Sequence, residues 1–181
     1  MLKIDEFNSG LKWQERESIS VEGFRTFALE SLTNKDRFAI VAAKFNSIVV
    51  DRLVEGAFDA FRLHRIPKEQ IDLVRVPGSF ELPIIAKKLA QKNCYLSIIA
   101  IGAVIRGDTD HYDYVASAAA NGIAQVALQT DTPIVFGVLT CNTLEQALDR
   151  AGGKAGNKGG EAAITAIEMA SLIRQLSVTK S

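Results

Sequence analysis

Short apolar runs alternate with amphipathic stretches from residue 37 to about residue 176. The runs have the length of strands, and their nearly unbroken apolar character is typical of strands buried on both faces; they lie at 38–43, 71–76, 96–105 and 134–139. The stretches between them repeat apolar residues at helical spacing. They predict helices that begin near residues 46–47, 79, 111 and 143, and a last helix after a glycine-rich break at 152–160.

Strands that alternate with helices predict a parallel sheet covered on both faces, because parallel strands need crossover connections. We therefore expect an α/β fold in three layers, flavodoxin-like, with a four-stranded parallel sheet between two layers of helices. In such folds ligands bind beyond the carboxyl ends of the strands. The segments in which to look for chemistry are therefore 44–47, 77–81, 105–111 and 140–143.

A change in composition near residue 36 divides the chain. Residues 1–36 are charged and lack periodicity, and we interpret them as an N-terminal extension; residues 37–177 form the domain and 178–181 a tail. The extension carries several acidic residues and no apolar core, which argues against a transit or signal peptide. No apolar run approaches the roughly 20 residues of a membrane helix. We expect a cytoplasmic protein without a membrane partner.

Charge and cysteine content narrow the function further. The chain has 21 basic and 21 acidic residues, and this balance does not favour nucleic acid as a partner. Cys94 and Cys141 show neither C-x-x-C spacing nor nearby histidines, so a metal site is not expected. We interpret both cysteines as buried free thiols.

The most promising chemical segment is Arg106–His111, between the strongest strand and a helix. Gly107 allows backbone to approach a ligand closely, and the N–H groups at the helix start can bind an oxyanion. His111 lies at that opening, where an imidazole could move protons. The alternative, about equally favoured by these residues alone, is that Asp108 or Thr109 caps the helix and His111 is a surface residue.

Three other segments have both a functional and a purely structural interpretation. Ser79 and Glu81 could bind a hydroxylated ligand, although helix capping explains them more simply. Phe45 could stack on a planar ring, or it could be a core residue. The run 150–160 offers three cations for an anion, or serves only as a mobile connection; it contains no P-loop, and the chain has no dinucleotide-binding fingerprint after its first strand.

Five motifs, taken together and in order, resemble the lumazine synthase family over most of residues 37–176. They are Ala43-Lys44-Phe45-Asn46, Val76-Pro77-Gly78-Ser79-Phe80-Glu81, Gly102-Ala103-Val104-Ile105-Arg106-Gly107-Asp108-Thr109, Phe136-Gly137-Val138-Leu139-Thr140 and Ala155-Gly156-Asn157-Lys158-Gly159. Each motif alone is weak evidence, but five in register are specific. Lys44 stands where arginine is commoner in the family.

The resemblance implies the condensation of 5-amino-6-ribitylamino-2,4(1H,3H)-pyrimidinedione with 3,4-dihydroxy-2-butanone 4-phosphate. The products are 6,7-dimethyl-8-ribityllumazine, phosphate and water, the penultimate step of riboflavin biosynthesis, and no metal or redox cofactor takes part. It also implies site residues, with His111 and Arg150 as the catalytic pair. The substrate-binding set comprises Phe45, Asn46, Ser79, Phe80, Glu81, Val104, Ile105, Gly107, Asp108, Thr109, Phe136 and Lys158, and Arg150, Phe136 and Lys158 come from the adjacent subunit.

The resemblance further implies a homopentamer. The short connection at 152–157 resembles members that form an icosahedral 60-mer shell, and riboflavin synthase is a partner that such a shell could enclose. The last part of the extension could add a strand to a neighbouring sheet. Two alternatives stay open: a flavin- or phosphate-ligand-binding homologue without catalysis, and a container whose shell is its main function.

Overall fold

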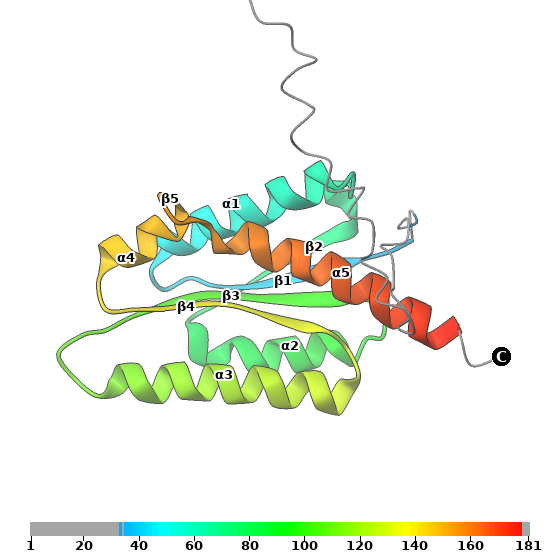
Figure 1. Ribbon diagram of the computed structural model, residues 1–181. Helices are drawn as coiled ribbons and strands as arrows, with labels where there is room; N and C mark the ends of the chain where they lie inside the picture. The colour runs from blue at the N-terminus through cyan, green and yellow to red at the C-terminus, as the bar shows by residue number, and fades with distance from the viewer. Residues whose placement is uncertain (1–32, 34, 179–181) are drawn as a thin grey trace, which may run out of the picture.

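The computed structural model describes residue 33 and residues 35–178, so most of the proposed extension and the end of the tail lie outside the described residues. Figure 1 shows three layers, with the sheet between two layers of helices. The elements, in chain order, are β1 (Phe38–Ala43), α1 (Ser47–Leu63), η4 (Lys68–Gln70), β2 (Ile71–Val76), η5 (Ser79–Glu81), α2 (Leu82–Ala90), β3 (Ser97–Ile105), α3 (His111–Thr130), β4 (Ile134–Cys141), α4 (Leu144–Asp149), β5 (Ala151–Gly153), β6 (Gly156–Asn157) and α5 (Lys158–Val178).

The main sheet has four parallel strands in the order β2-β1-β3-β4. The predicted α/β, flavodoxin-like fold is confirmed. The six residues of β1 are all buried, as are the first eight of the nine in β3, because these two strands occupy the centre of the sheet and are covered on both faces.

Each face of the sheet has its own apolar core. On one face α1 and α5 pack over side chains such as Ile40, Ile99 and Ile101. On the other face α2 and α3 cover Val41, Ile98 and Ala100. The alternation of side chains along a strand sends successive residues to opposite cores, so a single apolar run contributes to both.

Three local predictions were wrong. Ser79 does not cap an α-helix, because a 3-10 turn intervenes and α2 begins at Leu82. The glycine-rich break predicted at 152–160 ends earlier: most of it folds into the β5–β6 hairpin, and α5 already begins at Lys158. Cys94 is an exposed thiol, whereas Cys141 is buried as expected.

The end of the proposed extension is joined to the last helix of the domain by an ion pair. Arg174 Nη2 lies 2.6 Å from Asp36 Oδ1, and the Thr33 N–H donates to the other carboxylate oxygen. Burial raises the pKa of Asp36, but the hydrogen bonds from Arg174 and Thr33 together with the Arg174 charge outweigh it, so the pKa lies below its ordinary value. The ionised form of Asp36 is therefore the one that stabilises the fold.

We expect Asp36→Asn to lower the free energy of unfolding at pH 7 by about 1–2 kcal/mol, because it leaves Arg174 without its charged partner. A lowered folded-state pKa stabilises the protein above the ordinary pKa of aspartate, and this contribution is lost as the pH falls through the folded-state value. The difference between wild type and Asp36→Asn in urea unfolding should therefore shrink from pH 7 to pH 3.

The matched control is Asp59→Asn, which removes an exposed pair with Arg62 at 3.0 Å. Exposed pairs contribute little, so this variant should unfold like wild type at both pH values. An Asp36→Asn effect of the same size at pH 7 and pH 3 would contradict the role of the charge.

Candidate functional site

The loop after β1 is held firmly against its neighbours at the carboxyl edge of the sheet. The Lys44 N–H donates to Val76 O at 2.7 Å, and the Phe45 N–H donates to Pro77 O at 3.1 Å. Asn46 adopts a left-handed backbone conformation with φ 57°, and its side chain donates to Ala103 O at 2.8 Å instead of capping α1. Phe45 is 71% exposed, so the interpretation as a core residue is wrong. Its ring is presented to solvent by a braced backbone.

Strand β3 continues past the end of β1. Its pairing with β1 ends at Ala42↔Ile101, whereas its pairing with β4 continues to Ile105↔Cys141. In a parallel strand, alternate residues direct both backbone polar groups to the same side. Because the Ala103 carbonyl faces the β1 side, the Ile105 N–H and C=O face that side too, where no strand is left to pair with them. A planar ligand with amide-like edges could bind there.

Turn η5 places three predicted residues beside this gap. Ser79 is buried against Gly102 of β3, where an added Cβ would lie 2.4 Å from Ser79 Oγ. Phe80 is exposed. Glu81 Oε2 accepts a hydrogen bond from the Gly78 N–H at 2.9 Å, which confirms the structural interpretation of Glu81 as a capping residue. The other carboxylate oxygen, Oε1, is not used in this bond.

The loop from Arg106 to Asp110 is exposed and leads directly into α3, whose first residue is His111. Neither Asp108 nor Thr109 caps this helix: the N-cap residue is Asp110, and it makes no side-chain capping bond. Among the described residues, the N–H groups of 107–109 donate to no backbone or side-chain acceptor. An added Cβ at Gly107 would meet nothing within 4 Å. These amides are therefore available to an anion from outside.

The sequence did not predict the contacts that Arg106 makes with two residues of the first turn of α3, just after His111. The Arg106 guanidinium lies 4.2 Å from the ring centre of Tyr112 and pairs with Asp113 at 3.0 and 3.4 Å. The only available signal was the presence of opposite charges seven residues apart in sequence, with a loop between them.

Arg150 and Lys158 form a second group, joined by the β5–β6 hairpin. The Lys158 N–H donates to Arg150 O at 2.8 Å, while Arg150 Nη1 donates to Gln146 O and Lys158 Nζ contacts Glu161 at 2.7 Å. In the part of the chain that the structure describes, neither side chain forms a hydrogen bond or an ion pair with residues 45–46, 79–81 or 104–111. Burial raises the pKa of the Cys141 thiol, and the charge of Arg150 offsets part of that shift.

Phe136 stands apart from both groups. It lies on β4, the open edge of the sheet, opposite Ala100, five residues before the end of β3 at Ile105. At about 3.3 Å per residue it is roughly 16 Å from the carboxyl edge. Its side chain is exposed.

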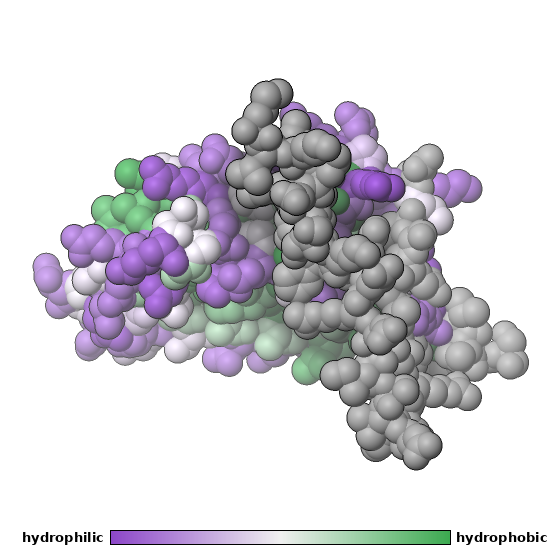
Figure 2. Space-filling model, turned by 45° about the horizontal axis from the view of Figure 1, so that its top comes forward, coloured by the Kyte–Doolittle hydropathy of each residue, from purple (hydrophilic) through white to green (hydrophobic). Residues whose placement is uncertain are grey.

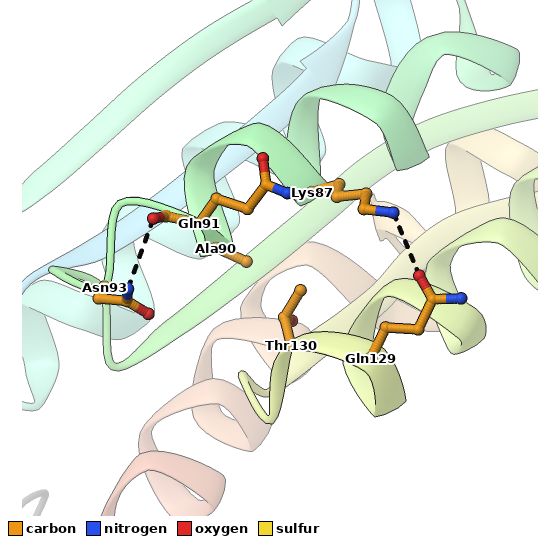
Figure 3. Close-up of a pocket in the computed structure, with 6 residues that line it drawn as sticks. All are labelled: Lys87, Ala90, Gln91, Asn93, Gln129 and Thr130. Atoms are coloured by element: carbon orange, nitrogen blue, oxygen red, sulfur yellow. Dashed lines mark hydrogen bonds between the residues drawn. The ribbon is translucent and has the colours of Figure 1, made fainter.

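The amino edge of the sheet carries polar interactions with a structural character. Asp72 accepts hydrogen bonds from Arg37 and Tyr95, both at 2.7 Å; the Arg37 bond is the main reason that the pKa of Asp72 is lowered. Burial, followed by the bond to Asp72, raises the pKa of Tyr95 to about 12. A shallow hollow between the ends of α2 and α3 contains a Lys87–Gln129 hydrogen bond at 3.2 Å (Figure 3). It contains none of the predicted site residues.

Within residues 33 and 35–178, no group of three His, Cys, Asp or Glu side chains lies together as a metal site would require. No helix in that range is long and apolar enough to cross a membrane.

These features define an α/β protein whose candidate small-molecule site lies at the carboxyl edge of its sheet. The model of the 6,7-dimethyl-8-ribityllumazine synthase family matches residues 35–174. A protein of Halorhodospira halophila (strain DSM 244 / SL1) named 6,7-dimethyl-8-ribityllumazine synthase is 54% identical over 140 residues, which are 77% of this chain and 90% of that relative. The chain belongs to the lumazine synthase family, as its motifs predicted, and it is a transferase of riboflavin biosynthesis.

Proposed function

We propose that this chain condenses 5-amino-6-ribitylamino-2,4(1H,3H)-pyrimidinedione with 3,4-dihydroxy-2-butanone 4-phosphate at a site shared between two subunits. The observation that carries the proposal is the position of Phe136 far back along β4, together with the lack, among the described residues, of any hydrogen bond or ion pair from Arg150 or Lys158 to residues 104–111. The residues of 45–46, 79–81 and 104–111 meet at the carboxyl edge, whereas Arg150 and Lys158 form a separate cationic group and Phe136 lies on the sheet edge. A neighbouring subunit can supply the second set to the first.

The pyrimidine binds between Phe45 and the gap beside β3. The exposed ring of Phe45 stacks on the heterocycle, and the unpaired backbone of Ile105 with that of Val104 and Phe80 matches its polar edge. Asn46 fixes the loop, and the free oxygen of Glu81 accepts from ribityl hydroxyls. Ser79 places its backbone rather than its buried hydroxyl at the ligand.

The phosphate of the second substrate binds at 107–109, where three unpaired N–H groups precede α3 and the Thr109 hydroxyl adds a donor. Arg150 of the neighbour pairs with the same phosphate, and Lys158 of the neighbour adds charge. An amine of the pyrimidine attacks the ketone, and one water leaves to give an imine. The adjacent hydroxyl-bearing carbon then loses a proton as phosphate departs, which leaves an enol that becomes a second ketone. The other amine attacks this ketone, and a second water leaves as the ring closes. Holding the two reactants in register supplies much of the acceleration.

His111 moves protons during imine formation and phosphate loss, since its exposed imidazole lies at the mouth of the phosphate loop. We expect His111→Ala to lower kcat by about 10- to 100-fold without abolishing turnover, because positioning persists. Steady-state kinetics test this.

The chain offers a matched control in its other histidine. His64 lies at the end of α1, where its Nδ1 is 2.8 Å from Ala60 O, so His64→Ala should leave kcat unchanged. Wild-type kcat in His111→Ala would remove His111 from the mechanism.

A homopentamer is supported by apolar surface that one chain leaves uncovered. Only three of the 20 residues of α3 are buried, and the exposed apolar residues Tyr114, Ala124 and Leu128, with polar Ser117 and Asn121 between them, form a stripe with the spacing of a helix–helix interface. Hydrophobic surface is also visible in Figure 2 at the end of the molecule where α4 and β5 lie. Light scattering on the purified protein measures the subunit number.

The tight β5–β6 hairpin, which leaves no inserted loop between Gly153 and Gly156, supports assembly of pentamers into an icosahedral 60-mer. Such a shell could enclose riboflavin synthase in the cytoplasm.

The division into extension (1–36), domain (37–177) and tail (178–181) belongs to the same proposal, with the end of the extension pairing with a neighbouring subunit. Electron microscopy of full-length protein and of a variant lacking residues 1–32 distinguishes shell from pentamer.

The reaction is tested by absorbance and fluorescence of the protein mixed with both substrates. Lumazine that forms only with protein and both substrates supports the proposal. Folded, assembled protein that gives no product above the uncatalysed background would favour a binding or container protein instead.

A further inference from the structure

Arg106 links the two ends of the phosphate loop. Its backbone belongs to the end of β3, where its N–H donates to Cys141 O of β4 at 2.9 Å. Its guanidinium reaches the first turn of α3 and pairs with both carboxylate oxygens of Asp113, at 3.0 and 3.4 Å. The same group lies 4.2 Å from the ring centre of Tyr112.

The contacts of Arg106 enclose the segment whose position matters most for the proposed reaction. Residues 107–110 lie between the anchor on β4 and the contacts on α3, and the residue next to Tyr112 is His111. Within the described residues, the N–H groups of 107–109 make no hydrogen bond that could hold the loop. The backbone bond from Asp113 N–H to Asp110 O at 3.0 Å orders only the helix start.

We propose that Arg106 is a positioning residue that holds the phosphate loop and His111 in their working geometry by acting through Tyr112 and Asp113. The inference rests on the proposed function, because it assigns a support to that site. A planar guanidinium can stack on a ring with its face while its edge pairs with a carboxylate, and a lysine ammonium cannot do both.

The charge arrangement distinguishes this role from direct phosphate binding. The Arg106 charge is already paired with Asp113, and a phosphate bound by Arg106 would bring a second anion beside that carboxylate. The side chains of the pair are 44% and 58% exposed. Exposed pairs add little to global stability, so the contacts can be removed without unfolding the domain.

The test compares Arg106→Gln, Asp113→Asn and the double variant with wild type. Arg106→Gln should raise KM for the phosphate substrate and lower kcat, together about 10-fold, because a small misplacement of binding groups is costly. Asp113→Asn should likewise raise KM for the phosphate substrate and lower kcat. The double variant should have the same kcat/KM as Arg106→Gln, since both substitutions break one and the same contact. KM for the pyrimidine should stay at the wild-type value, and Arg106→Lys should restore only part of the loss.

A second readout does not depend on turnover. Hydrogen–deuterium exchange of the peptide covering 105–115 should be faster in Arg106→Gln, with the thermal midpoint unchanged. The control is Arg37→Gln, which breaks an Arg–Asp pair of similar exposure at the opposite edge of the sheet and should leave exchange of that peptide unchanged. Unchanged kinetics in Asp113→Asn, or unchanged exchange in Arg106→Gln, would overturn the inference. If wild-type protein showed no turnover, but exchange of this peptide were still faster in Arg106→Gln than in wild type, the proposed function alone would be overturned.

Discussion

We expect Gly159→Ala to lower the free energy of unfolding by about 3 kcal/mol or more, enough to endanger folding of a domain with a total of roughly 5–15 kcal/mol. Gly159 lies in the first turn of α5, where this helix crosses α1. An added Cβ would lie 1.9 Å from Leu53 O and 2.5 Å from Leu53 C, which are backbone atoms of α1. Backbone cannot rotate away as a flexible side chain can, so the two helices must separate.

Separation would open the core on that face of the sheet, because α1 and α5 cover it together. Alanine is favoured over glycine within helices by about 1 kcal/mol, so a destabilised variant would show that the contact outweighs intrinsic propensity. Urea unfolding followed by circular dichroism measures the change.

The neighbouring glycine is the control. Gly160→Ala gains the same helix propensity, but its Cβ would approach Gly56 O only to 3.2 Å, a tight contact rather than an overlap. It should unfold close to wild type. If both variants unfolded at the wild-type midpoint, the crossing of α1 and α5 at Gly159 would not be as close as the structure has it.

The sheet could be predicted from the sequence because parallel strands buried on both faces are nearly continuous apolar runs. The run 38–43 is confirmed residue for residue as β1, and 71–76 as β2. The hairpin at 151–157 could not be predicted in this way. Its two strands are short, glycine-rich and mostly exposed, so they lack any alternation of apolar and polar positions.

Within the site, position relative to the strand ends was predictable, but side-chain contacts were not. The order of elements placed Phe45, Ser79 and Ile105 at one edge of the sheet, and in the structure each lies at or just beyond the carboxyl end of β1, β2 or β3. The bond from Asn46 to the Ala103 carbonyl spans 57 positions and depends on a left-handed backbone at Asn46. No local pattern encodes such a contact, and the stacking of Arg106 on Tyr112 is of the same kind.

We expect Arg150→Ala to lower kcat/KM for the phosphate substrate by ~100-fold, mostly by raising its KM, because the variant cannot make the charge-assisted contact to phosphate that we propose for Arg150. Arg150 follows α4 and its side chain is braced by a bond to Gln146 O at 2.9 Å, so it is presented in a defined direction. Inorganic phosphate, used as a competitive inhibitor, should bind less tightly to the variant. Arg62→Ala, which removes an exposed arginine at the end of α1, should bind it like wild type.

The same variant tests whether the site is shared between subunits. His111→Ala and Arg150→Ala are each impaired, but in a hybrid oligomer one subunit can supply the intact histidine and its neighbour the intact arginine. With random mixing of equal amounts, both halves are intact in about a quarter of the interfaces, so doubly tagged hybrids from co-expression should recover about a quarter of wild-type activity. Sites that lie within one chain would contain no intact pair in any hybrid. Hybrids that are no more active than the separate variants would therefore show that Arg150 and His111 of one subunit act in the same site, and would contradict a site shared between subunits.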